Sequence, residues 1–208
     1  MNEKIPTIPN IQSLPKITQK QLVTEFMTEK LGDNYETIYT DGSKLQEGET
    51  AAAFYCMEHK LGVGSKLSNA HSVLSAELIA MNEALNHVKH YHNNDKTTII
   101  FSDSKSNLQK ITNLKIGDNP DFVTQQLIHS IQFCRQNLYK TIKFQWIPGH
   151  IDLKGHDAAD RLAGLTARHG RQTTRSELDH PDAKQIIQKR ADNLNKAAIE
   201  RMTESHGK

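Results

Sequence analysis

The sequence has little of several features, and each shortage narrows the class of protein. Its 208 residues include two cysteines, carry a net charge of only +2, and contain no apolar run close to the length of a membrane span. The polar N-terminus lacks the apolar core of a secretion signal. The small net charge argues against a strongly basic nucleic-acid polyelectrolyte. We therefore expect a soluble intracellular protein of the nucleus or cytoplasm.

The two cysteines are expected to be buried thiols. Cys56 and Cys134 lie in otherwise apolar segments and lack the close spacing of zinc ligands, so a disulfide or a zinc site is the less favoured alternative.

Length and composition predict one domain with tails. Hydrophobic residues make up 36% of the chain, which is enough for a core but lean for this length. We interpret 1–34 as a loosely attached N-terminal linker with one short helix, because prolines occur at positions 6, 9 and 15. Residues 35–170 form the expected folded domain, and 171–208 form a polar linker followed by a helix over about 181–202.

Within the central domain, residue periodicity predicts an α/β fold. Strands are expected at 36–41, 51–57, 61–68, 97–103 and 141–148, and helices at about 72–92, 104–112, 120–137 and 157–169. Three successive strands indicate an antiparallel meander, and the two strands separated by helices indicate parallel additions. The prediction is a mixed five-stranded sheet flanked by helices.

Four carboxylates occupy unusual positions in this pattern, and each has an ordinary explanation. Asp41 precedes a glycine and fits a hairpin turn, although only its N-terminal side has strand character. Glu77 falls on the apolar stripe of the long helix, unless it reaches water from the stripe's edge. Asp103 ends a strand and also suits a helix N-cap. Asp160 borders the packed face of the last helix, where an early acid also suits the helix dipole.

Taken together, the four acids favour a metal site over four coincidences. Each is expected near a strand end or a helix start of one sheet. Converging carboxylates repel one another unless cations neutralise them, and oxygen-rich sites suit Mg²⁺ or Mn²⁺. A pair of such ions is the arrangement that in-line phosphoryl displacement requires.

Four sequence blocks resemble the ribonuclease H type 1 domain, in the form carried by non-LTR retrotransposon polyproteins. The blocks are YTDGS, SAELIAM, FSDS, and WIPGH followed by HDAADRLA, and the likeness covers 35–169. The resemblance implies a ribonuclease H-like fold and an endoribonuclease that cleaves the RNA strand of an RNA/DNA hybrid, leaving 5'-phosphate and 3'-hydroxyl ends. The implied metal ligands, for two Mg²⁺ ions or substituting Mn²⁺, are Asp41, Glu77, Asp103 and Asp160.

The resemblance also implies roles for residues around the acids. His150 would assist proton movement or product release. Hydrogen bonds to 2'-hydroxyl groups across the minor groove would select the RNA strand. The candidates for these contacts are Ser43, Ser75, Asn82, Ser104 and Lys105. If the chain belongs to a polyprotein, a reverse transcriptase domain is an expected partner.

The chain departs from the family pattern in two places. Family members commonly have Gly and then an Asn-Glu pair after the loop histidine, whereas this chain reads IDLKGHD over 151–157. It also lacks the basic, Trp-rich insertion of bacterial members, so phosphate contacts fall to Arg168, Arg171 and Arg175, unless these belong to a solvated linker. Two alternative functions stay open: a catalytically weak or silent hybrid-binding module, and a nuclease or integrase acting on DNA.

Overall fold

The computed structural model describes residues 11–30, 34–91, 96–115 and 117–171, together with single residues at 182, 184, 187, 188, 192 and 196. The elements, in chain order, are η1 (Ile11–Ser13), α1 (Lys16–Lys30), β1 (Tyr35–Lys44), β2 (Thr50–Cys56), β3 (Leu61–Leu67), α2 (Val73–Tyr91), β4 (Thr97–Ser102), α3 (Lys105–Asn113), α4 (Phe122–Asn137), β5 (Ile142–Trp146) and α5 (Lys154–His169). The helix expected over 181–202 falls largely outside the described residues. No helix in the described part of the chain combines the length and apolar character needed to cross a membrane.

The five strands form one mixed sheet in the order β3-β2-β1-β4-β5. The β1–β2 and β2–β3 pairs are antiparallel, and the β1–β4 and β4–β5 pairs are parallel. This arrangement confirms the expected meander with two parallel additions. Because the chain builds outward from β1 on one side and then returns to its other side, the β1–β4 boundary is the topological switch point, where open α/β sheets place ligand-binding groups.

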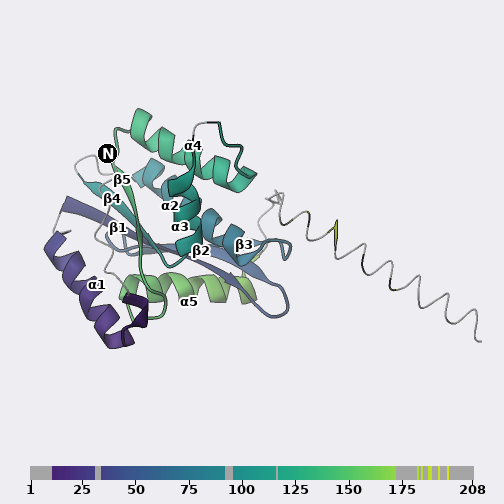
Figure 1. Cartoon of the computed structure of the whole chain (residues 1–208), viewed down its shortest axis with the longest axis horizontal. Coiled ribbons are helices and arrows are strands. Elements are labelled where there is room, and N and C mark those ends of the chain that lie inside the picture. Colours follow the sequence, from purple (N-terminus) through teal and green to yellow (C-terminus); the bar gives the residue numbers. More distant parts are fainter. Residues whose placement is uncertain are drawn as a thin grey trace, which may run out of the picture.

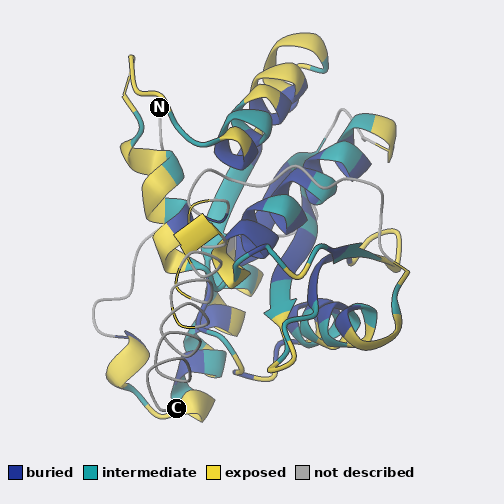
Figure 2. Cartoon of the chain, turned by 90° about the vertical axis from the view of Figure 1, so that its right-hand side faces the viewer, coloured by how far each residue is buried: buried dark blue, intermediate teal, exposed yellow. Residues whose placement is uncertain are grey.

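Helices cover both faces of the sheet (Figure 1). One core lies between the sheet and α2 and α4, and includes Ile38, Leu85, Ile100 and Leu127. The other lies on the α5 side and includes Tyr39, Phe101, Ile151 and Ala159. Figure 2 shows the dark-blue, buried segments concentrated in the strands and the adjoining helix faces. The sheet therefore positions α2 on one of its faces and α5 on the other.

The N-terminal helix α1 packs against the domain, which differs from the loose attachment expected from sequence. Ile11 and Val23 are each only 7% exposed and join the core on the α5 side. The Tyr39 hydroxyl also donates a hydrogen bond to the sulfur of Met27 at 3.7 Å. Val23 and Met27 are one helical turn apart, so the contact surface is a single short stripe. Such a stripe is too short to give α1 a clear periodic signature.

Strand β1 continues through the Asp41-Gly42 pair and ends at Lys44, so this pair is not a turn and Asp41 is not at a strand end. Asp41 pairs with Ala53, and Gly42 pairs with Ala52. The glycine is needed for close approach: a Cβ at position 42 would lie 2.6 Å from the backbone nitrogen of Glu77. Strand continuation and helix packing explain this dipeptide better than turn chemistry does.

Helix α5 begins at Lys154, three residues before the expected start at position 157. Asp160 is therefore in the second turn of the helix, and His156 is in the first. The left-handed backbone at Asp152, with φ of 55°, precedes the helix and changes the chain direction. The earlier start brings an additional side chain, His156, onto the buried face.

Candidate active site

Asp41 and Asp103 are supplied by neighbouring parallel strands at the switch point of the sheet. The pairing of β1 with β4 stops two residues before Asp41, and Asp103 directly follows the end of β4. The main chain of Asp103 is fixed, because its carbonyl accepts hydrogen bonds from the Lys105 backbone at 2.8 Å and from the Trp146 indole at 3.0 Å. The two strands therefore bring two carboxylates close together near the carboxyl end of β4.

Glu77 is supplied by the second turn of α2, on the opposite side of β1 from α5. Its side chain is buried, at 5% exposure, and Oε2 has no hydrogen-bond partner among the described residues. Gly42 allows the helix to approach β1 closely at this point. A buried carboxylate oxygen without a partner is costly, which indicates a cationic ligand at this position.

Helix α5 contributes Asp160 and His156, one turn apart. His156 is only 1% exposed, and its Nε2 lies 3.5 Å from Oδ2 of Asp103, within ion-pair distance. The potential ligand atoms of Asp41, Asp103 and His156 all lie within 4.8 Å of one another. Asp160 is half-buried beside this group and acts electrostatically on Asp41.

Burial and neighbouring carboxylates raise the pKa values of Asp41 and Glu77. The pKa of Asp41 rises to about 6, first because of burial and then because of the Asp103 and Asp160 carboxylates, while His156 and His150 act in the opposite direction. The pKa of Glu77 lies well above its ordinary range, again through burial and then through Asp41 and Asp103. Asp41 thus interacts electrostatically with each of the other three expected metal ligands.

His156 partly offsets this negative charge. Burial alone would lower its pKa, but Asp103 and then Asp41 and Asp160 outweigh burial and raise it above the ordinary value. When it is protonated, the imidazole provides positive charge beside the acids, at a position where a metal ion would also be attracted.

The residues at this site fit a divalent cation. The donor set is rich in carboxylate oxygens, which Mg²⁺ and Mn²⁺ prefer, and Glu77 keeps a buried oxygen unpaired. Mutual repulsion among the acids is the condition that a bound cation relieves. The arrangement can therefore hold a metal ion next to a phosphate group.

The loop between β5 and α5 presents His150. Its φ of 54° places it in the left-handed region, and the side chain is exposed. Ile147 and Ile151 are each 1% exposed and anchor the loop on both sides of it. His150 is close enough to Asp41 to act on its pKa, which it lowers.

Three of the five expected substrate contacts lie beside the acids, on β1 or at the start of α3. Ser43 is half-buried on β1, two residues after Asp41, and Ser104 precedes α3. Lys105 is exposed, and its Nζ lies 5.4 Å from the centre of the Trp146 ring. Arg168 and Arg171 are also exposed, whereas Arg175 lies outside the described residues.

Asn82 is not among the residues gathered at the acids. Its side-chain oxygen accepts a 2.6 Å hydrogen bond from the Ser130 hydroxyl of α4. Asn82 is five positions after Glu77, which is well off the same helical face. The side chain therefore belongs to the α2–α4 interface.

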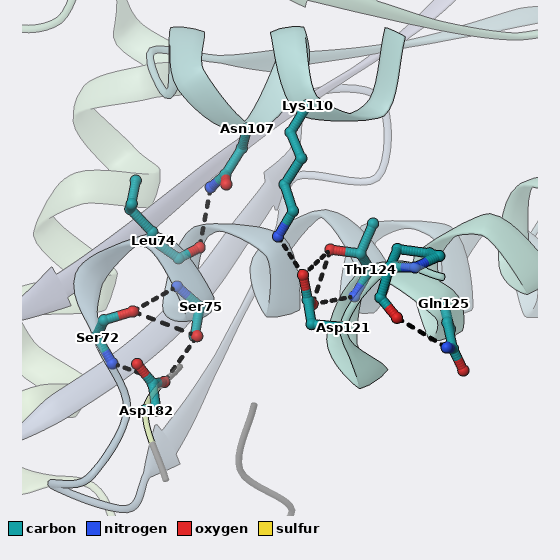
Figure 3. A network of polar contacts seen from close by, with 10 residues as sticks. Ser72, Leu74, Ser75, Asn107, Lys110, Asp121, Thr124, Gln125 and Asp182 are labelled. Carbon is teal, nitrogen blue, oxygen red and sulfur yellow. Dashed lines mark hydrogen bonds and ion pairs between the residues drawn. The ribbon is translucent and has the colours of Figure 1, made fainter. Parts of the chain in front are cut away.

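Ser75 is close to the acids but already has a partner from the C-terminal segment (Figure 3). Oδ2 of Asp182 accepts hydrogen bonds from the Ser75 hydroxyl at 2.7 Å and from the Ser72 backbone nitrogen at 3.0 Å. Asp182 is 3% exposed. It therefore caps the first turn of α2, where backbone N–H groups and the helix dipole favour an anion.

Sequence reasoning missed His156 and Asp182 as members of this region. Extending the apolar stripe of α5 back by one turn would have found His156, but the assumed helix start at 157 left it in a loop. Asp182 has no comparable signal, because it lies 107 positions from the serine it binds. Only tertiary structure brings such distant residues together.

Comparisons with known proteins give a consistent result. The RNase H family matches residues 33–168. Similar solved structures include the N-terminal RNase H domain of a Mycobacterium tuberculosis protein, with 16% identity, coverage of 65% of this chain and 95% of that chain, and a TM-score of 0.49. LC11-RNase H1, isolated from compost, has 18% identity, coverage of 65% and 96%, and a TM-score of 0.50.

A third similar structure is RNase H1 from Halobacterium salinarum, with 16% identity, coverage of 64% and 98%, and a TM-score of 0.48. LC11-RNase H1 has also been solved in complex with an RNA/DNA hybrid. No curated protein sequence matches this chain. The family match spans well over half of the sequence and includes Asp41, Glu77, Asp103 and Asp160. The chain therefore belongs to the RNase H family of hydrolases.

Proposed function

We propose that this RNase H family member is a metal-dependent endoribonuclease that hydrolyses the RNA strand of RNA/DNA hybrids and leaves 5'-phosphate and 3'-hydroxyl ends. The main support is the convergence of buried or half-buried carboxylates from β1, β4, α2 and α5 in one electrostatic field. Family membership supports the hybrid as the substrate class.

The proposed cofactor is a pair of Mg²⁺ ions, which Mn²⁺ can replace. Asp41, Glu77, Asp103 and Asp160 would hold them. When bound, such ions supply Lewis-acid stabilisation of the attacking and leaving oxygens. The contribution of the chain is to fix the carboxylates on rigid elements, so that little reorganisation is needed when a phosphate arrives.

The chain's own residues would also handle protons and substrate. The exposed His150 is placed to accept or deliver a proton at the edge of the acids, or to assist release of the product. Ser43, Ser104 and Lys105 are the better-placed candidates for contacts with the hybrid. Ser75 can join them only when its hydroxyl exchanges Asp182 for substrate.

A catalytically weak or silent hybrid-binding module is the second candidate. The observation in its favour is the His156 imidazole beside Asp103, in the segment that departs from the family pattern. A permanently protonated His156 would compete with a metal ion for the same carboxylates. For this second candidate we also propose descent from a non-LTR retroelement. A reverse transcriptase domain would then be its partner, if the chain is part of a polyprotein.

The decisive experiment is cleavage of end-labelled RNA/DNA hybrid in Mg²⁺ and in Mn²⁺, with duplex RNA and duplex DNA as controls. We expect cuts only in the RNA strand of the hybrid, with 5'-phosphate ends, and none with Asp103→Asn. Hybrid binding that Asp103→Asn leaves intact, together with no turnover of the parent in either metal, would establish the binding module instead. Cleavage of duplex DNA would contradict both.

A further inference from the structure

A second group of potential metal ligands lies at the end of α2 opposite Glu77. This group, called here the Cys–His cluster, comprises Glu36 of β1, Cys56 at the end of β2, His59 in the β2–β3 turn and His87 near the end of α2. Their potential ligand atoms all lie within 4.8 Å of one another. Three of the side chains are buried, and the His59 side chain is 39% exposed.

The Nδ1 atom of His59 has more polar neighbours than it can satisfy. It lies 2.9 Å from Nε2 of His87, 3.3 Å from the Cys56 sulfur and 3.8 Å from Oε1 of Glu36. A ring nitrogen carries either one proton or one lone pair, so it can serve only one of these neighbours by hydrogen bonding. A cation at the centre of the group would satisfy all four side chains.

The spacing of the ligand atoms is close to that of a tetrahedral zinc site. Ligands bonded at normal zinc distances lie about 3.3–3.8 Å apart around a tetrahedral ion. The measured separations are 3.3 Å for Cys56 to His59, 3.8 Å for His59 to Glu36 and 3.9 Å for Cys56 to Glu36. The 2.9 Å between the two imidazoles is shorter, and a small outward movement of the exposed His59 would correct it.

Outer contacts orient Glu36 toward the cluster. Its Oε2 accepts a 2.9 Å hydrogen bond from the Thr98 hydroxyl and lies 3.6 Å from the Lys140 ammonium group. These contacts leave Oε1 directed at His59 and Cys56. Outer-shell support of this kind accompanies most protein metal ligands.

His87 is held in a form and place suited to metal binding. Its ring lies between Phe54 and Tyr91, with centroid distances of 5.2 and 5.0 Å. Burial and then the nearby His59 lower the pKa of His87, which favours the neutral imidazole that binds metals. His87 and Tyr91 also line an open hollow between β3, α2 and α4, which gives an ion a path of entry.

We propose that the Cys–His cluster binds a structural Zn²⁺ ion. A thiolate and two imidazoles are the ligands of a borderline-soft transition metal rather than of Mg²⁺, which distinguishes the cluster from the carboxylate site. Burial raises the pKa of the Cys56 thiol to about 11, so Zn²⁺ would have to displace its proton on binding, and the resulting thiolate would add a negative charge that the ion compensates. Four protein ligands leave no open position, so the ion would be structural and would join β1, β2 and the C-terminal end of α2.

The test is zinc binding by the full chain after treatment with a chelator. We expect about one tightly bound equivalent by elemental analysis. Replacement by Co²⁺ should give the thiolate-to-metal charge-transfer band of a cysteine ligand. Binding should persist in Asp41→Asn and in excess Mg²⁺, because the carboxylate site is separate.

Matched variants distinguish ligands from bystanders. Cys56→Ser should abolish the charge-transfer band and weaken zinc binding by more than about 100-fold, beyond the effect typical of outer-shell residues. Cys134→Ser, at the other buried thiol, should leave both unchanged. His59→Gln lies in an exposed turn, so it should fold normally and still lose zinc, whereas His90→Gln should retain it.

The outcome separates cleanly. Zinc-dependent elevation of the melting temperature that is lost in both Cys56→Ser and His59→Gln supports the site. Should Cys56→Ser fail to fold, His59→Gln alone decides, since its circular dichroism is expected to match the parent. Absence of a charge-transfer band in the parent, or equal zinc affinity in parent and His59→Gln, would overturn the proposal.

Discussion

The two ends of α2 present different kinds of polar group. At the N-terminal end, Glu77 faces Asp41 and Asp103, a set of oxygen ligands with strong mutual repulsion. At the C-terminal end, His87 faces a cysteine, a histidine and a single glutamate. The two groups are about 15 Å apart along the helix, from ten residues at 1.5 Å each. One helix therefore joins a hard-ligand site to a softer one.

The comparison teaches how the same core supports opposite electrostatic conditions. Near Glu77, burial and like charge act together and leave an unpaired oxygen. Near Glu36, the buried Lys140 and the Thr98 hydroxyl compensate the single carboxylate. At the N-terminal end, repulsion among carboxylates destabilises the fold unless a cation is bound. At the C-terminal end, the charge is compensated, and His59 only has more polar neighbours than it can hydrogen-bond. This difference orders the predictions below.

The largest expected effect is on cleavage. Asp103→Asn should lower hybrid cleavage by more than about 1,000-fold, because loss of a metal ligand removes several kcal/mol of transition-state stabilisation. Cleavage rates in saturating Mg²⁺ measure it. Cys56→Ser, at the other end of α2, should change the rate little. Equal losses in the two variants would mean that the two ends do not act independently.

The next effect is on stability as a function of pH. Burial and then the neighbouring acids raise the pKa of Asp41 from 3.8 to about 6 on folding. Without metal, ionisation of Asp41 therefore lowers stability by on the order of 3 kcal/mol as pH increases from about 4 to 6, and the contribution of Asp41 is constant above that. Asp41→Asn should remove this loss and melt higher than the parent at pH 7 in chelator. Thermal melts across pH measure it, and added Mg²⁺ should reduce the difference. A variant that melts lower at every pH would contradict the charge account.

A smaller effect concerns the approach of α2 to β1. Gly42→Ala places a methyl group against the Glu77 backbone, and overpacking of this kind costs typically 1–3 kcal/mol. Chemical denaturation measures the cost. Gly164→Ala is the control, because its added methyl meets the end of the Arg168 side chain at an ordinary contact distance of 3.7 Å and should stabilise α5 slightly. Zinc binding at the far end of α2 should survive Gly42→Ala, if the two ends are independent.

The smallest expected effect on stability comes from the hydrogen bonds of Asp182 at the start of α2. Asp182→Ala should reduce stability by about 0.3–2 kcal/mol, the range for an anionic side chain near a helix N-terminus, because Ser72 itself remains the N-cap. Denaturant midpoints measure it. The same variant should strengthen hybrid binding if Ser75 contacts substrate, because its hydroxyl is released. Unchanged affinity would remove Ser75 from the proposed substrate contacts, and the exposed Asp192→Ala serves as control.

Sequence patterns predicted most of the fold, because strand alternation and helix periodicity are local properties. The mixed five-stranded sheet was predicted from three adjacent strands and two separated by helices, and the structure confirms it. Glu77 was recognised from the same logic, as a charge on an apolar stripe. What the patterns missed was local geometry set by distant contacts, such as the continuation of β1 through Gly42 and the earlier start of α5.

The site was less predictable than the fold for a related reason. The acids were noticed because Glu77 falls on an apolar stripe and the other three were expected near a strand end or a helix start. His156 and the Cys–His cluster were not, because histidine and cysteine are common in both exposed and buried positions. A metal-binding role for these residues can be recognised only from the atoms that they face. In the Cys–His cluster, those atoms come from β1, β2, the β2–β3 turn and α2.

Strand β1 is hydrogen-bonded on both sides, to β2 and to β4, and Asp41 sits within its β2 ladder. Its peptide plane cannot rotate without breaking that ladder, so this carboxylate is the least adjustable of the acids. In the proposed metal site, any difference in the size of the ion would therefore be accommodated by the acid that follows β4 and by those on the two helices. The centre of the sheet would thus be the rigid part of the proposed site, and the other three acids would adjust their positions to the ion.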